Sequence, residues 1–177
     1  MRFVAWGLGG VLSLALFQAP ADFSGRWTTD PDPAVASAAG APGRGPGRGD
    51  MGSGWGSTIT IVQNDKQLTV EYVFFGRGDL QPPLKFVYAL DGSETKNSVW
   101  MGRGEQVQTS RAAWDGARLK ITTVHRFTDP ATSKPMSEEV VTVLTRESAT
   151  SLIVETLRAG VLGGQPSSTR TVYRRQP

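Results

Sequence analysis

Apolar and polar residues alternate with a period of two along most of the chain after residue 57. This alternation is typical of β-strands that turn one face toward a core. The alternating runs cover residues 59–61, 68–74, 84–90, 107–114, 119–127, 140–144, 152–156 and 168–175. Together with residues 23–29 they predict eight or nine strands, and residues 98–101 are a further short candidate.

Turn-forming sequences separate these runs at residues 64–66, 91–92, 115–116 and 147–150. No segment has the periodicity of an amphipathic helix. Strands that follow one another through short turns favour an antiparallel meander, and a long meander avoids exposed edges by closing on itself. We therefore predict an all-β fold, an antiparallel up-and-down β-barrel of about 8 strands. A β-sandwich is the alternative.

The first 21 residues have the features of a secretory signal peptide. Arg2 supplies a short positive region, residues 3–17 are almost wholly apolar, and residues 19–21 (Ala-Pro-Ala) form a small-x-small cleavage site. A membrane-spanning helix needs ~20 apolar residues, and this run is shorter and broken by glycines. We expect an exported protein, periplasmic or extracellular, whose mature chain 22–177 keeps no stable membrane span. A retained N-terminal anchor is the alternative.

Residues 30–56 differ in composition from the rest of the chain, being rich in glycine, proline and arginine. Such a segment lacks the apolar periodicity needed to bury a face, and its glycines are costly to order. We predict a disordered insert within a single barrel domain that covers residues 22–177.

The overall composition excludes several kinds of site. The chain has no cysteine and one histidine, so a disulfide framework, a cysteine-ligated metal and a three-histidine zinc site are excluded. The formal charge of +3 is spread along the chain, whereas nucleic-acid binding calls for a clustered basic face. The acidic residues fall mostly at turns, without the inward pair of a glycosidase. We expect no metal, no cofactor, no nucleic-acid partner and no enzymatic activity.

The stretch DFSGRW, residues 22–27, places Gly25 and Trp27 on the first predicted strand. A Gly-x-Trp at this position resembles the calycin superfamily, which includes the lipocalins. The resemblance implies that Trp27 closes one end of the barrel and that an arginine late in the chain packs across its ring. Arg170, Arg174 and Arg175 are the candidates, and we favour Arg170 or Arg174 because they share a strand face with Val172.

A second resemblance covers most of the mature chain. Its motifs are DFSGRW at 22–27, ITIVQ at 59–63, YALDGSETKN at 88–97, WDGARLKITT at 114–123 and STRTVYRR at 168–175. In these motifs and in its Gly/Pro/Arg-rich insert, the chain resembles the exported bacterial "FSGxW" proteins, an uncharacterised lipocalin-like family. The resemblance implies a lipocalin-like barrel and no specific activity.

The predicted inner face combines aromatic and apolar side chains with a few hydroxyls and one imidazole, a mixture typical of small-molecule pockets. The candidate ligand-binding residues are Tyr72, Phe74, Phe86, Tyr88, Thr123, His125 and Tyr173. The same mixture suits a barrel filled by its own side chains. A lone inward histidine is also what a single-ligand haem site would use, although His125 has no other support for that role.

These observations leave three hypotheses for the function. The first is an exported lipocalin-like barrel that binds a small apolar or amphipathic molecule. The second is a cell-envelope or extracellular interaction module with a filled barrel and no ligand. The third is an enzyme, which the absence of a recognisable catalytic constellation makes the weakest.

Overall fold

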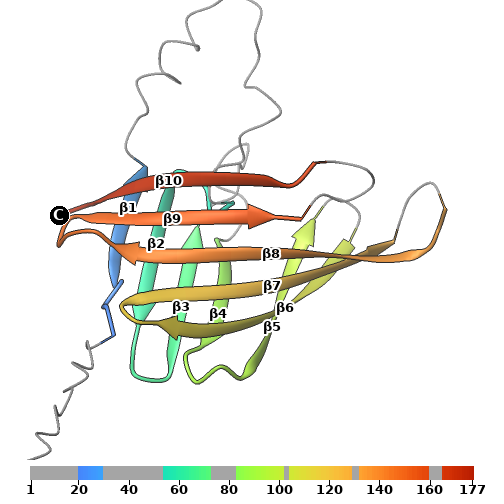
Figure 1. The fold of residues 1–177 in the computed structure, drawn as a ribbon, viewed down its shortest axis with the longest axis horizontal. Helices are drawn as coiled ribbons and strands as arrows, with labels where there is room; N and C mark the ends of the chain where they lie inside the picture. Colours follow the sequence, from blue (N-terminus) through green and yellow to red (C-terminus); the bar gives the residue numbers. More distant parts are fainter. Residues whose placement is uncertain (1–19, 30–53, 73–82, 102–103, 129–131, 160–164) are drawn as a thin grey trace, which may run out of the picture.

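The computed structural model describes residues 20–29, 54–72, 83–101, 104–128, 132–159 and 165–177, with the backbone alone for 99–101 and 104–106 (Figure 1). Residues 1–19 of the expected signal segment 1–21, residues 30–53 of the expected insert 30–56, and Phe74 lie outside these residues. Residues 54–56 are described and Trp55 is buried, so the expected disordered insert does not extend to residue 56. No helix of the described residues is long and apolar enough to cross a membrane.

The described residues form one antiparallel sheet of ten strands in the order β4-β3-β2-β1-β10-β9-β8-β7-β6-β5. The strands are β1 (Gly25–Thr29), β2 (Thr58–Gln63), β3 (Gln67–Tyr72), β4 (Leu84–Ala89), β5 (Glu94–Met101), β6 (Gly104–Asp115), β7 (Arg118–Thr128), β8 (Pro135–Arg146), β9 (Ser151–Arg158) and β10 (Ser167–Arg175). Each strand pairs with its sequence neighbour except at the β4–β5 step, and β1 pairs with β10. The sheet curls into a nearly closed barrel, which confirms the all-β antiparallel barrel (Figure 1).

The number of strands is ten rather than about eight. The main addition is β5, of which the sequence pattern indicated only residues 98–101. Its sequence, ETKNSVWM, begins with five polar residues and so lacks the apolar alternation of its neighbours. The register with β6, from Glu94 opposite Arg111 to Met101 opposite Gly104, makes it a strand in spite of its composition.

The barrel closes between β4 and β5 through a side chain. Asn97 on β5 is buried, and its Oδ1 accepts a hydrogen bond from the Val87 backbone N–H at 2.7 Å. Its Nδ2 donates to the Val87 carbonyl at 3.1 Å. The amide of Asn97 therefore satisfies the same backbone groups of β4 that a neighbouring strand would satisfy.

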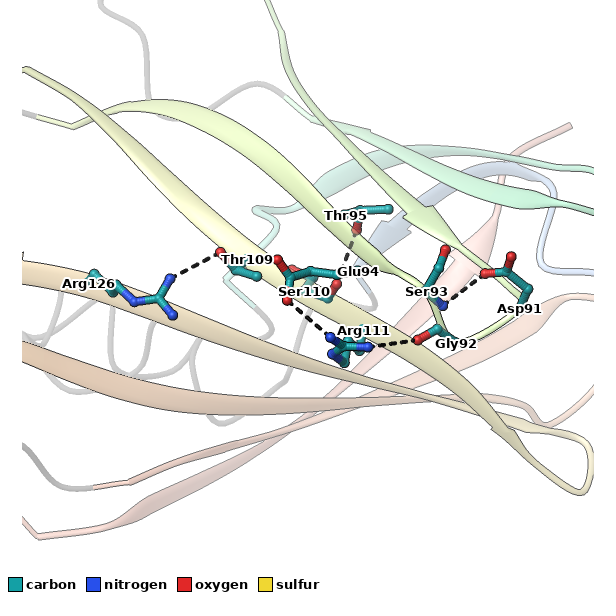
Figure 2. A network of polar contacts seen from close by, with 9 residues as sticks. All are labelled: Asp91, Gly92, Ser93, Glu94, Thr95, Thr109, Ser110, Arg111 and Arg126. Atoms are coloured by element: carbon teal, nitrogen blue, oxygen red, sulfur yellow. Dashed lines mark hydrogen bonds and ion pairs between the residues drawn. The ribbon is translucent and has the colours of Figure 1, made fainter.

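The β4–β5 turn is held by polar contacts on the outer surface (Figure 2). Asp91 Oδ1 accepts a hydrogen bond from the Ser93 N–H at 2.9 Å, as expected of a hairpin turn of this sequence. Arg111 on β6 donates to the Gly92 carbonyl at 3.4 Å and pairs with Glu94 at 3.2 Å. These contacts hold the start of β5 in register beside the end of β4.

Asn97→Ala leaves the Val87 N–H and C=O without their partner at a buried position. We expect it to lower the free energy of unfolding by about 1–3 kcal/mol, the usual cost of unsatisfied buried polar groups. Urea unfolding measures the effect, and the exposed neighbour Ser98→Ala is the control, expected within about 0.5 kcal/mol of the wild type. Equal stabilities of the two variants would show that Asn97 does not hold the β4–β5 junction.

One apolar cluster fills the interior of the barrel. Seventeen buried residues contribute, from Phe23 and Trp27 near the start of β1 to Tyr173 on β10. Within it Tyr72 stacks on Phe86 with ring centroids 5.6 Å apart, and burial raises the pKa of Tyr72 to about 12. The cluster is therefore a packed core, and the Tyr72 phenol within it is uncharged at neutral pH.

Residues 54–57, just before β2, cover part of this core. Trp55 is 6% exposed, and its hydrogen bond to the Tyr88 side chain draws it into the cluster. The Tyr173 hydroxyl donates to the Gly56 carbonyl at 2.7 Å. Trp55 is therefore a second tryptophan, besides Trp27, that covers the core.

Trp27 closes one end of the barrel beneath an arginine. Its side chain is fully buried, and the Arg175 guanidinium lies over its ring, 5.6 Å from the centroid. The arginine is therefore Arg175, and our preference for Arg170 or Arg174 was wrong. Strand parity explains the correction: Arg175 lies directly opposite Trp27 on β10 and, like Tyr173, has inward parity.

Glycine at position 25 leaves the space that the Arg175 guanidinium occupies over Trp27. A Cβ there would lie 3.0 Å from Arg175 Nε, and the backbone φ of +140° disfavours any other residue. Arg175 Nη2 also donates to the Ser24 carbonyl at 3.0 Å. Gly25, Trp27 and Arg175 therefore form one interlocked unit.

Residues 22–27, which we call the N-terminal plug, are fixed by further hydrogen bonds. Trp27 Nε1 donates to the Phe23 carbonyl at 2.9 Å, and Phe23 stacks on Trp114 with ring centroids 6.0 Å apart. Gln63 Oε1 accepts from the Phe23 N–H at 3.0 Å, and its Nε2 donates to the Ala21 carbonyl at 2.9 Å. The plug is therefore held to β2 by a glutamine side chain as well as by backbone pairing.

A double-mutant cycle tests the Trp27–Arg175 contact. We expect Trp27→Ala to cost about 3–5 kcal/mol as a large buried aromatic. Arg175→Ala should cost about 1–2 kcal/mol through the lost cation–π contact and hydrogen bond. In urea melts the pair should couple by ~0.5–3 kcal/mol, whereas Arg174→Ala should add to Trp27→Ala without coupling. Coupling to Arg174 instead of Arg175 would refute the assignment.

Candidate ligand-binding site

The inner face of strands β6–β9 changes from apolar to polar along the strands. Near the plug it carries Leu119, Leu144 and Val154, which face one another across β7, β8 and β9. Farther from the plug, the same face carries buried hydroxyl residues. These are Ser110, Thr123, Thr142 and Thr156. We call the end of the barrel opposite the plug the site end.

A continuous row of polar side chains crosses four strands at the site end. Asn97 on β5 lies opposite Gln108 on β6, Gln108 opposite His125 on β7, and His125 opposite Glu138 on β8. Asn97 and Gln108 are buried, whereas His125 and Glu138 are half-buried. We call these four residues the polar row. Because directly opposed residues have Cβ atoms ~4.5–5.5 Å apart, neighbours in the row can bind one small group together.

Arg158 lies beside the polar row on β9. It faces Val140, which is two residues along β8 from Glu138, so Arg158 and Glu138 are diagonal neighbours. Gly54 makes room for the guanidinium, since a Cβ at Gly54 would lie 3.1 Å from Arg158 Nη2. The φ of +81° at Gly54 likewise favours glycine.

Strands β7 and β8 extend beyond the other strands (Figure 1). A hollow of about 430 Å³ lies along this extension, next in sequence to His125 and Glu138. It is lined by Arg126, Phe127, Thr128, Pro135, Met136 and Ser137. Phe127 and Met136 face each other and continue the inner faces that carry His125 and Glu138. The site end therefore combines a polar row with an adjacent half-buried apolar pair.

Burial and two charged neighbours determine the pKa of His125. Burial is the main cause that lowers the pKa of His125 from its ordinary value of 6.5. The Glu138 carboxylate acts in the opposite direction, and the Arg158 guanidinium lowers the pKa further. At neutral pH the imidazole is therefore uncharged, with one nitrogen that donates and one that accepts.

The expected ligand-binding residues fall into two groups. Tyr72, Phe86, Tyr88 and Tyr173 belong to the packed core. Thr123 and His125 lie on the inner face at the site end, where Thr123 is buried and His125 is half-buried. The structure thus separates the aromatic candidates from the two polar ones.

Two of the hydroxyl side chains on this face bind each other. Ser110 Oγ and Thr123 Oγ1 are 2.9 Å apart and hydrogen-bond each other. Among the described residues, no group of three or more His, Cys, Asp or Glu side chains is placed to hold a metal ion. The described groups of this face suit reversible binding through hydrogen bonds and charge.

Apart from Asn97, whose strand β5 was expected only in part, the sequence analysis missed five residues at this site: Gln108, Phe127, Glu138, Met136 and Arg158. All five continue the alternation of recognised strands, so extending the inner parity of β6–β9 past the last apolar position would have found them. A search for alternating apolar residues overlooks them because three of the five are polar. Only the register between strands brings them together.

Comparison with known proteins does not assign a family. No protein-family model matches the chain, and no curated protein matches it with significant similarity. The function must therefore be inferred from the site itself.

The titration of His125 tests its environment, and as the only histidine of the chain it gives unambiguous imidazole NMR signals. We expect a midpoint below 6.5, which Glu138→Gln lowers further and Arg158→Gln raises. A midpoint at or above 6.5 in the wild type would contradict the burial of the ring.

The same shift makes stability depend on pH. A folded-state pKa below the unfolded value means that the unfolded chain binds the proton more readily. Protonation of His125 therefore destabilises the folded state. Above pH 6.5 the imidazole is uncharged in both states, and the free energy of unfolding decreases as pH falls from 6.5 through the folded-state pKa. Urea melts across this window should show a smaller pH dependence for His125→Gln than for the wild type.

Proposed function

We propose that the protein is an exported, lipocalin-like binding protein that holds a small amphipathic molecule at the site end of its barrel. The observation that carries the proposal is the change of polarity along the inner face. The packed cluster occupies the interior near the plug, whereas the polar row and the hollow lie beyond it. A ligand with one apolar and one polar part matches the two surfaces that adjoin there.

The apolar part of the ligand packs against Phe127 and Met136 in the hollow. Both side chains are half-buried, so a ligand can remove further apolar area from water, at about 25 cal/mol per Å². The polar part reaches Gln108, His125 and Glu138, which supply both donors and acceptors. Ligand binding is thus driven by the hollow and oriented by the polar row.

Export supports this function because a binding barrel outside the cytoplasm meets molecules from the environment. The first 21 residues, with their positive start, apolar run and Ala-Pro-Ala site, support cleavage before Asp22. N-terminal sequencing of the protein from its host's periplasm or medium tests this part of the proposal, with Asp22 as the expected first residue.

The second candidate is an interaction module with a filled barrel and no small ligand. The packed cluster favours it, because seventeen buried residues among those described fill the core with the chain's own side chains. The two candidates differ in what the site end does, so an experiment on the hollow separates them.

Titration with octyl glucoside below its micelle concentration tests binding at the hollow. We expect saturable binding by calorimetry, together with a shift of the His125 imidazole signals. Met136→Lys should weaken binding by about tenfold or more, because it replaces apolar area that the ligand covers by a charge, and complete burial of a methionine is worth ~1.5–3 kcal/mol. The control is Val62→Lys, which places the same charge at an exposed apolar position on β2.

Saturable binding that Met136→Lys weakens and Val62→Lys leaves intact supports the proposal. Equal binding by both variants places the ligand elsewhere. No saturable binding of any octyl amphiphile favours the interaction module.

A further inference from the structure

Three ionisable side chains lie near one another at the site end, on three adjacent strands: His125 on β7, Glu138 on β8 and Arg158 on β9. All three are half-buried. Within the described parts of the chain, no hydrogen bond or ion pair within 4.0 Å engages any of them. This differs from the outer surface, where Glu94 pairs with Arg111 and Glu71 with Lys85.

Half-buried charges without a close partner are costly, because burial removes part of their hydration. Glu138 contributes one negative charge and Arg158 one positive charge, while His125 is neutral at pH 7. The trio therefore has no net charge but a strong local dipole. A ligand with a single charge would satisfy one of the two charged groups and leave the other partly desolvated.

The spacing of the two charges suits a compact dipolar group. Diagonal neighbours on one sheet face have Cβ atoms ~7–8 Å apart, and both side chains are long enough to reach a group held between them. Arg158 Nη2 approaches Gly54 closely, 3.1 Å from where a Cβ would stand, which places the guanidinium beside the segment 54–57. His125 lies directly opposite Glu138 and can hydrogen-bond the same group.

We propose that this site binds the zwitterionic head group of an amphiphile, with its ammonium at Glu138 and its carboxylate at Arg158. The neutral imidazole of His125 and the amide of Gln108 provide further hydrogen bonds to the carboxylate or to a neighbouring polar atom. The apolar tail lies along Phe127 and Met136 in the hollow. The inference rests on the proposed function, because it names the chemical class of the ligand at the same site.

Four probes with the same octyl chain test the head group. They are N-octyl-N,N-dimethylglycine (zwitterionic), octanoate (anionic), octyltrimethylammonium (cationic) and octyl glucoside (uncharged), each titrated by calorimetry below its micelle concentration. We expect the zwitterion to bind the wild type about tenfold or more tightly than either singly charged probe.

Charge-removing variants should then change the order of preference. Glu138→Gln leaves Arg158 as the charged group, so octanoate should become the tightest of the charged probes. Arg158→Gln should favour octyltrimethylammonium instead. The matched controls are Glu155→Gln and Arg170→Gln, which remove the same charges from a directly opposed pair on the outer face of β9 and β10. These controls should keep the wild-type order.

The outcomes separate the two proposals. If all four probes bind equally and the variants do not change the order, the hollow binds amphiphiles but the zwitterionic head group is refuted. If octanoate or octyltrimethylammonium binds the wild type as tightly as the zwitterion, the head group is likewise refuted. If no probe binds, the proposed function fails with it. Circular dichroism of each variant checks that the fold is retained.

Discussion

The contact between Arg175 and Trp27 is the interaction on which the barrel depends. It reinforces the backbone pairing of β1 with β10, which joins the first strand of the chain to the last and leaves neither strand with an exposed edge on that side. Gly25 permits it, because any side chain there would meet the guanidinium. The arginine is itself exposed to solvent, so a charged residue closes the apolar core without being buried.

The other closure, at β4 and β5, is of a different kind. Backbone pairing is replaced there by the single amide of Asn97, which bonds the N–H and C=O of Val87. An asparagine can do this because its side chain carries the same donor and acceptor as a peptide group. The barrel thus has one junction made by strand pairing and an arginine, and one made by a side-chain amide.

Most of the fold could be predicted from the alternation of apolar residues, because strands with a buried face must follow it. β5 is the exception, since its polar sequence becomes a strand through its pairing with β6. The arginine over Trp27 could have been identified from parity, as Tyr173 and Arg175 share the inward face of β10. The same alternation places Gln108, His125 and Glu138 on inner strand faces, but only the register between strands shows that they are neighbours.

The pairing of β1 with β10 has a consequence for the order of folding. Arg175 bonds Ser24 across 151 positions of sequence, so this contact has one of the largest loop-closure costs in the sheet. Hairpins such as β6–β7 can form during synthesis of the chain. The N-terminal plug cannot pack against Arg175 until β10 has been synthesised. If such a chain crosses a membrane N-terminus first, β1 therefore stays unpaired with β10 during translocation. The barrel is completed only after the C-terminal strand has crossed.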